Sequence, residues 1–296
     1  MWQALGVSIY RLLLDTGAGA EPLVAPVLIT ALDGWVDAGD AGTTAAEQIA
    51  KDGEVVAEFD VDAILDYRAR RPTLDIEGGR LTELDWLTLN VRRVRASGRD
   101  LLVLTGPEPD YRWQEFGRDV VEMALRLGVV ESICLGAIPA MVPHTRPTPV
   151  LMTGADRKPT DGDPPLPAEF LRVPGASVNI VEIGMAEHGI PSCGFWAHVP
   201  HYVAGPYAGG ALALVERVCS HLGITVPLDE LIDEVQKERI RLDEVVAERP
   251  DAQAYLERLE EVAPPTTLVS GDELAAEVER FLRGATGDDR NPFEDL

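Results

Sequence analysis

The fold is decided by the stretch Pro26–Asp40, which reads PVLITALDGWVDAGD. Its first part, Pro26–Leu32, is a short apolar run between turn residues, the pattern of a strand buried on both faces of a sheet. The polar, glycine-containing segment Asp33–Asp40 follows, and a helix is expected over roughly Ala38–Lys51. A buried strand, a short polar loop and a helix in this order predict an α/β fold.

The same strand–loop–helix pattern occurs three more times along the chain. Further buried strands are expected at Leu101–Thr105, Ser132–Ala137 and Cys193–Val199. Further helices are expected at Trp113–Leu127, Ser177–His188 and Tyr207–Leu222. Strands that alternate with helices of this length predict a mostly parallel central sheet with helices on both faces.

The middle of the chain is less regular. Val55–Phe59 and Leu87–Arg95 are predicted as additional strands, with an arginine-rich turn at Arg68–Pro72 between them. Residues 154–175 are rich in Asp and Pro, which predicts a long loop, as a lid over a site or as a subunit contact.

The pattern changes after Pro227, so we expect an α/β domain over 1–227, a helical arm over 228–284 and a disordered tail over 285–296. Apolar residues recur at helical spacing from Leu228 to Val246, and Pro250 is expected to end this helix. Two more helices are expected, one around Tyr255–Val262 and one that opens with a capping box at Ser270. Residues 228–296 carry 20 acidic and 8 basic residues, which is half of the total charge of −24.

Composition restricts the classes of partner. A net charge of −24 without any basic run argues against nucleic acid and against an anionic membrane surface. No apolar run is long enough to span a bilayer, and the first residues do not form a signal peptide. The three cysteines lie in apolar stretches without metal-ligand spacing, which fits free thiols in a reducing cytoplasm. We therefore expect a cytoplasmic protein with protein or small-molecule partners.

Polar loops follow the four buried strands, and in a parallel sheet these loops meet at one edge, which we call the rim. We predict that the rim gathers acids, histidines, an arginine and aromatic side chains. The candidate rim residues are Asp33, Trp35, Asp37, Glu108, Asp110, Trp113, His144, Arg146, Trp196, His198, His201 and Tyr202.

Two interpretations of the rim remain open. In one, these side chains form a pocket for a polar or anionic ligand. In the other, they bind the loops to one another, with Asp33 and Asp37 serving the helix after the first strand and Glu108 and Asp110 the helix near Trp113. Ser177 is interpreted as the N-cap of the helix that follows it.

Specific motifs for catalysis are lacking. Gly34–Gly42 matches neither a dinucleotide-binding fingerprint nor a phosphate-binding loop, and no nucleophile elbow occurs. The His198-x-x-His201 pair with Asp33 has no recognised metal-ligand spacing. We therefore expect no metal and no cofactor, and an enzymatic activity is uncertain but less favoured.

Several motifs resemble one known family. They are ALDGWVDAG at Ala31–Gly39, GPEP at Gly106–Pro109, VPHTRP at Val142–Pro147, GIP at Gly189–Pro191, Trp196 and VPHYV at Val199–Val203. In this order they resemble the proteasome assembly chaperone family, in the branch named after the second such chaperone. The resemblance covers about residues 7–225, and the composition and the arm resemble actinobacterial members.

The resemblance implies a fold related to nucleoside phosphorylase/hydrolase-like proteins, homo-oligomers, and relatives that bind proteasome subunits without a known reaction. It therefore favours a non-enzymatic oligomeric chaperone or adaptor linked to proteasome assembly or a related complex. The alternative is an enzyme on that scaffold, with Glu108 or Asp33 as acid or base and with His144 and Arg146 as anion ligands. An ATP-dependent ligase ranks lowest, because the three lysines lie outside the rim motifs.

The end of the chain departs from one feature of the family. Some archaeal relatives dock through a C-terminal hydrophobic–Tyr–any residue signature, whereas this chain has Asp295 at the tyrosine position. Any proteasome contact is therefore expected to use another surface, such as the acidic arm.

Overall fold

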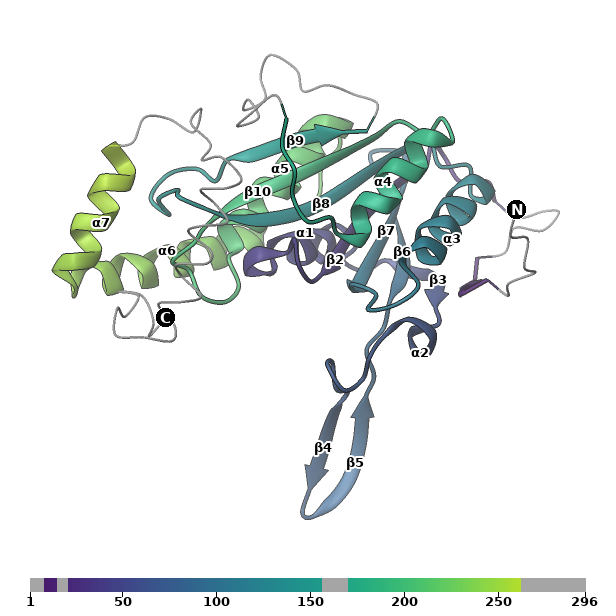
Figure 1. Ribbon diagram of the computed structural model, residues 1–296, viewed down its shortest axis with the longest axis horizontal. Coiled ribbons are helices and arrows are strands. Elements are labelled where there is room, and N and C mark those ends of the chain that lie inside the picture. The colour runs from purple at the N-terminus through teal and green to yellow at the C-terminus, as the bar shows by residue number, and fades with distance from the viewer. Residues whose placement is uncertain (1–7, 15–20, 156–169, 262–296) are drawn as a thin grey trace.

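A computed structural model describes residues 8–14, 21–155 and 170–261. An eight-stranded sheet forms the centre, in the order β1-β3-β6-β7-β2-β8-β10-β9, and a separate two-stranded sheet pairs β4 with β5 (Figure 1). The strands are β1 (Tyr10–Leu12), β2 (Val27–Asp33), β3 (Glu54–Phe59), β4 (Thr73–Glu77), β5 (Arg80–Asp85), β6 (Asn90–Ala96), β7 (Arg99–Pro107), β8 (Glu131–Ala140), β9 (Val150–Gly154) and β10 (Ser192–Pro200).

The four strands predicted to be buried are the middle of the sheet. β7, β2, β8 and β10 are neighbours and run parallel to one another. Nearly all their side chains are buried, as expected for strands covered on both faces. This part of the prediction is confirmed.

The outer strands make the sheet mixed. β1, β3 and β6 add antiparallel at one side and β9 adds antiparallel at the other. β6 and β7 are joined by the two-residue turn Ser97–Gly98, in which both residues have positive φ, the geometry that suits the twist of a hairpin. A connection this short can only join antiparallel strands.

The helices form a layer on each face of the sheet. α1 and α5 pack on one face and α3 and α4 on the other, each layer with its own apolar core (Figure 1). The helices of the described residues are η1 (Ala38–Asp40), α1 (Ala41–Ile49), α2 (Val61–Ile64), α3 (Trp113–Arg126), α4 (Ser177–Glu187), α5 (Ala208–Leu222), α6 (Asp229–Ala247) and α7 (Pro250–Glu261). The four helices expected within the α/β part are confirmed to within a few residues.

The β4–β5 hairpin was not predicted beyond a turn at Arg68–Pro72. Gly78 and Gly79 connect the strands with positive φ, as a two-residue hairpin loop requires. Every residue of both strands is exposed, and the hairpin projects away from the rest of the molecule (Figure 1). Its sequence escaped prediction because an unburied strand has no apolar run.

The helices after Pro227 are present as α6 and α7. Leu231 and Leu242 of α6 join the core of the α1–α5 layer, and Lys51, just after α1, forms an ion pair with Glu230 of α6. α6 ends at Ala247, and Pro250 is the first residue of α7, where its missing N–H costs nothing. The helix expected from Ser270, the tail, and most of the loop predicted over 154–175 lie outside the described residues.

Within the described ranges, no helix is both long and apolar enough to cross a bilayer.

Gly136 of β8 leaves room for the Trp196 ring of the neighbouring strand β10 and for the Val36 carbonyl of the loop after β2. A Cβ at Gly136 would lie 2.6 Å from the Trp196 ring and 2.7 Å from the Val36 carbonyl oxygen. We expect Gly136→Ala to lower the free energy of unfolding by about 2 kcal/mol, since the ring and the backbone cannot both move aside. Urea unfolding measures this change. Gly175→Ala, where the nearest atom is 3.9 Å away, is the control, and equal stabilities of the two variants would contradict the prediction.

Candidate functional site

The carboxyl ends of β2, β7, β8 and β10 lie at one edge of the sheet, as predicted, because the four strands are parallel. The candidate rim residues do not share one pocket there. They divide into a group around α1, a group around Glu108, a sheet-facing pair and a group under the C-terminal helices.

Asp37 caps α1 from the loop after β2. It is 6% exposed, and its Oδ1 accepts hydrogen bonds from the backbone N–H groups of Gly42 at 2.6 Å and Thr43 at 3.2 Å. The Thr43 hydroxyl donates to Oδ2. The loop is also held by β8, because the Ala137 N–H donates to the Val36 carbonyl. The structural interpretation of Asp37 is therefore the one that the contacts bear out.

The environment of Asp37 changes its proton affinity. Burial raises the pKa of this carboxyl to about 6, and the hydrogen bonds from Thr43 and Gly42 only partly oppose the effect. At neutral pH the cap of α1 is therefore a carboxylate whose pKa lies only about one unit below the pH.

Glu108 caps a different helix from the one expected. Its Oε1 accepts a hydrogen bond of 2.7 Å from the backbone N–H of Ser177, the first residue of α4. The N-cap position belongs to Ala176, and the Ser177 hydroxyl is buried with no hydrogen-bond partner in the described part of the chain. The interpretation of Ser177 as an N-cap is wrong, because a carboxylate from a distant loop takes that place.

Asp33 and Asp110 lie on either side of an arginine that the sequence analysis did not single out. Arg70 approaches Asp33 Oδ2 with Nη1 at 3.7 Å and Asp110 Oδ1 with Nε at 3.9 Å. Asp110 also accepts a 2.7 Å hydrogen bond from the Asp66 N–H, so it orders the loop before Arg70 and does not cap α3. The arginine-rich turn was the only sequence signal for this contact.

The tryptophans have different roles. Trp196 lies in the sheet face with its indole Nε1 donating to Thr153 Oγ1 at 2.8 Å, and Trp113 donates to the Pro109 carbonyl. Trp35 is 65% exposed at the tip of the first loop. The three rings therefore do not enclose a common pocket.

His198 is the unusual member of the rim. It is 1% exposed on the same strand face as Trp196, and neither ring nitrogen has a hydrogen-bond partner among the residues that the structure describes. Burial lowers its pKa to about 4, so the imidazole is neutral. Its backbone N–H is bonded to Pro149, so the strand position itself is ordinary.

His144 connects the rim to α6. Its backbone N–H donates to the Tyr202 hydroxyl at 2.8 Å, and Nδ1 lies 2.8 Å from the same oxygen. Nε2 lies 3.2 Å from Asp243 Oδ1 on α6. This pattern assigns the proton to Nε2, which donates to Asp243 while Tyr202 donates to Nδ1. Burial lowers the pKa of His144, and Asp243 opposes this shift.

α7 covers the rest of this group. The Tyr255 hydroxyl lies 3.0 Å from Nε2 of His201, whose Nδ1 faces the Ala140 carbonyl at 3.3 Å. Glu260 accepts hydrogen bonds from Arg146, through its carbonyl, and from Thr145, through its carboxylate. Tyr202, Val246, Ala252 and Leu259 form a small apolar cluster beneath these contacts. This part of the rim is closed by the chain's own C-terminal helices.

Two shallow hollows open next to the rim. One of about 680 Å³ lies over the start of α3, lined by Asp110 to Glu115 and by Arg118. The other, of about 470 Å³, lies between α1 and β6 and includes Asp33. In the ranges that the structure describes, no three His, Cys, Asp or Glu side chains are grouped to hold a metal ion.

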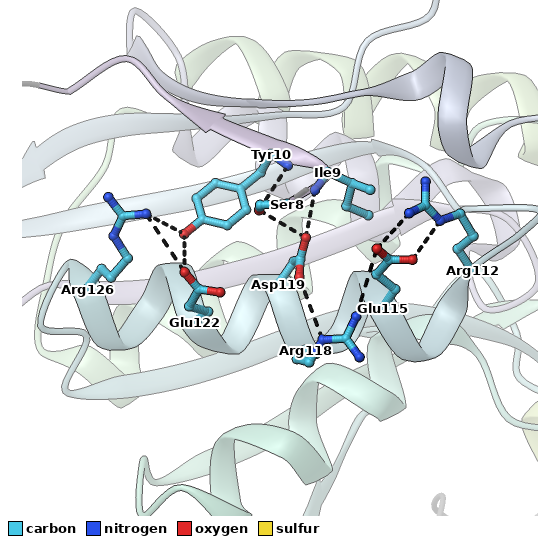
Figure 2. Close-up of polar contacts among 9 residues, drawn as sticks. All are labelled: Ser8, Ile9, Tyr10, Arg112, Glu115, Arg118, Asp119, Glu122 and Arg126. Carbon is cyan, nitrogen blue, oxygen red and sulfur yellow. Dashed lines mark hydrogen bonds and ion pairs between the residues drawn. The ribbon is translucent and has the colours of Figure 1, made fainter. Parts of the chain in front are cut away.

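α3 is fixed by polar contacts along its length (Figure 2). The buried Asp119 accepts hydrogen bonds from the Ile9 N–H at 2.8 Å and the Ser8 hydroxyl at 3.0 Å, which hold the segment leading into β1. Arg112, in a left-handed conformation before the helix, donates two hydrogen bonds to Glu115. These contacts are structural, and they account for the arginines beside the first hollow.

The buried Asp37 predicts a pH dependence. Its folded pKa of about 6 exceeds the unfolded value of 3.8, so its contribution is fully present below pH 3.8 and is lost as pH rises through 6. Compared with Asp37→Asn, the wild type should lose about 3 kcal/mol of unfolding free energy between pH 3.5 and pH 7. Chemical denaturation of both proteins across this range measures the difference.

The exposed substitution Glu187→Gln controls for the loss of one negative charge. A constant difference between wild type and Asp37→Asn across the pH range would contradict the prediction.

Several proteins with solved structures are similar to this chain. A Corynebacterium glutamicum protein of unknown function is 32% identical, with a TM-score of 0.77, over 92% of this chain and 99% of that chain. A Mycobacterium tuberculosis protein described as a proteasome-assembly chaperone homologue is 30% identical, with a TM-score of 0.68, over 78% and 99%. The archaeal proteasome activator PbaB of Pyrococcus furiosus, at 15% identity and a TM-score of 0.58 over 81% and 99%, shares the fold.

The comparison with curated proteins gives no match. Among family models, the one described as the PAC2 family matches residues 31–246, which run from β2 to near the end of α6. The family match and the solved structures together show that this chain belongs to the PAC2 family.

Proposed function

We propose that the protein is a non-enzymatic, oligomeric chaperone or adaptor that acts in the cytoplasm on the proteasome or a related protein complex. The observation that carries this proposal is membership of the PAC2 family together with 30% identity to a protein described as a proteasome-assembly chaperone homologue. That relative is matched over 99% of its own length, so the similarity is not confined to a fragment of it.

The state of the rim supports the same proposal. His144, Arg146 and His201 are all engaged by α6 or α7, and Glu108 and Asp37 cap helices. Side chains committed to internal contacts of this kind are costly to redirect toward a substrate, because each bond broken leaves a buried polar group. A surface whose side chains are not committed to such contacts is therefore the better place for a protein partner.

The exposed apolar face of the β4–β5 hairpin supports the proposal that the protein is an oligomer. Leu74 lies opposite Leu84, and Ile76 lies opposite Leu81, so these four side chains share one face. Ile76 is 60% and Leu81 71% exposed. A two-stranded hairpin is only marginally stable in water, and an apolar face of this kind marks an interaction site. We assign it to contact with another copy of the chain.

The hairpin gives a test of the oligomer. Ile76→Ser with Leu81→Ser should reduce the molar mass measured by light scattering to that of one chain, with an unchanged circular dichroism spectrum. Asp75→Ser with Glu83→Ser, a cross-strand pair on the other face, is the control and should keep the oligomer. A monomeric wild type, or an oligomer that survives the apolar substitutions, would refute this assignment.

The proposed partner is tested by affinity purification. The tagged full chain, expressed in a cell that contains a proteasome, should recover proteasome subunits or ring-assembly factors after cross-linking. Recovery of neither in replicate purifications, with the oligomer intact, would rule the proposal out.

One observation favours the alternative of an enzyme on a nucleoside phosphorylase/hydrolase-like scaffold. His198 is buried, and within the described ranges both of its ring nitrogens lack a hydrogen-bond partner, as in a residue awaiting a polar ligand. A panel of nucleosides, nucleotides and phosphate in thermal-shift measurements decides it, since stabilisation that disappears in His198→Phe is required. The ATP-dependent ligase has less support, because Lys51 and Lys237 are paired with Glu230 and Glu234.

A further inference from the structure

The hollow between α1 and β6 has a chemical character that the rest of the rim lacks. This groove of about 470 Å³ is lined by the end of β2, by η1 and α1, by the segment entering β6 and by the end of β7. Most of its lining residues are polar, and the exceptions are Leu87, Gly106 and Pro107. The polar and charged groove residues include Asp33, Asp40, Glu47, Asn90, Arg92 and Thr105.

Two polar groups that line the groove have no hydrogen-bond partner within the described part of the chain. Thr105 of β7 is 8% exposed, and no hydrogen bond of its hydroxyl is present among the described residues. Asn90 of β6 is its cross-strand neighbour, and its amide oxygen is buried without a partner among the same residues. Leaving a buried acceptor such as this oxygen unsatisfied costs about 1–3 kcal/mol. Two such polar groups side by side in an open groove indicate a place where a ligand supplies the missing bonds.

The α1 wall adds carboxylates that have no structural task. Asp40 occupies the N-cap position of α1, yet its side chain makes no capping bond, because Asp37 already caps the helix. Glu47 lies two turns further along the same helix. Neither carboxylate has an ion-pair or hydrogen-bond partner in the part of the chain that the structure describes. The usual explanation for an acid near a helix start therefore does not apply to Asp40.

The balance of charge decides the kind of ligand. Asp33, Asp40 and Glu47 contribute three negative charges to the groove, against the single positive charge of Arg92. Arg70, at 3.7 Å, offsets part of the charge of Asp33. A phosphate or carboxylate would be repelled, so this groove does not suit the anionic ligand considered for the rim. Carboxylates and an amide oxygen are acceptors, and they call for a ligand with several N–H donors and a positive charge.

We propose that this groove binds an arginine or lysine side chain presented by a partner protein. A guanidinium or ammonium group would donate to Asp40 and Glu47, and its neighbouring donors would reach the Asn90 oxygen and the Thr105 hydroxyl. The predominantly polar lining disfavours a small apolar molecule, which buries itself in apolar surroundings. The assignment of a protein as the source of the cation rests on the proposed function.

Blocked peptides on the full-length protein test the site. The probes are N-acetyl-Gly-Arg-Gly-amide, its lysine counterpart, and its citrulline counterpart, which keeps the shape of arginine but lacks the charge. Isothermal titration and NMR chemical-shift changes should show saturable binding of a cationic peptide. Asp40→Asn with Glu47→Gln should weaken that binding at least tenfold. Asp52→Asn with Glu187→Gln, which removes the same charge from exposed sites outside the groove, should not.

Thr105→Val separates binding from folding. It removes an unpartnered hydroxyl without changing the shape, so stability should be kept while peptide affinity falls severalfold. Four results would overturn the proposal: no saturable binding, equal binding by the groove and control variants, equal binding of the citrulline peptide, or guanidinium ion binding as tightly as the arginine peptide. The last result identifies a site for a free cation.

The affinity purification distinguishes this proposal from the proposed function. If the wild type and Asp40→Asn/Glu47→Gln recover the same partners equally, the groove proposal fails and the chaperone remains. If the peptides bind in the groove but no proteasome partner is recovered, the groove remains and the proposed function fails.

Discussion

The rim depends on one buried carboxylate, that of Asp37. β2 and β8 are paired only as far as Thr30 and Cys134, and beyond that point the chain after β2 must be held in another way. The carboxylate bonds the first N–H groups of α1, and the adjoining peptide bonds β8 at Ala137. Because glycine at positions 42 and 136 leaves room for this approach, the loop can lie flat on the end of the sheet. The loops after the other parallel strands then pack against this loop, whose position is fixed.

The C-terminal helices hold the rim loops that Asp37 does not contact. α6 is anchored in the core of the α1–α5 layer by Leu231 and Leu242, so it is continuous with the body of the protein. From there α6 and α7 reach over the loops after β8 and β10, where the chain uses His144 and His201 as hydrogen-bonding partners for Asp243 and Tyr255. Histidines in a loop cluster are common signals of catalysis, but here the ring nitrogens of His144 and His201 are occupied by groups of the chain itself.

What remains open lies outside this closed region. The hairpin carries apolar side chains into solvent, and the groove beside α1 carries the carboxylates of Asp40 and Glu47, which have no partner among the described residues. The two surfaces have different chemistry, one suited to burial against an apolar surface and the other to a basic side chain. Under the proposed function, the hairpin would hold the oligomer together and the groove would recognise another protein. Like the acidic groove, the net charge of −24 favours partners with basic surfaces.

The sequence by itself determined the central parallel strands, their helices, and the order of the rim loops. Apolar runs such as Pro26–Leu32 and helical spacing such as that of α3 report burial directly, and burial is what defines these elements. The sequence did not determine the hairpin, since β4 has no continuous apolar run but only the alternating residues Leu74 and Ile76. Nor did it show that Glu108 caps α4, or that Asp243 and Tyr255 contact the ring nitrogens of His144 and His201. Those contacts join residues 69, 99 and 54 positions apart in the chain. Only the packing of the tertiary structure brings such groups within hydrogen-bonding distance, and that packing decided which polar side chains are used up and which remain free for a partner.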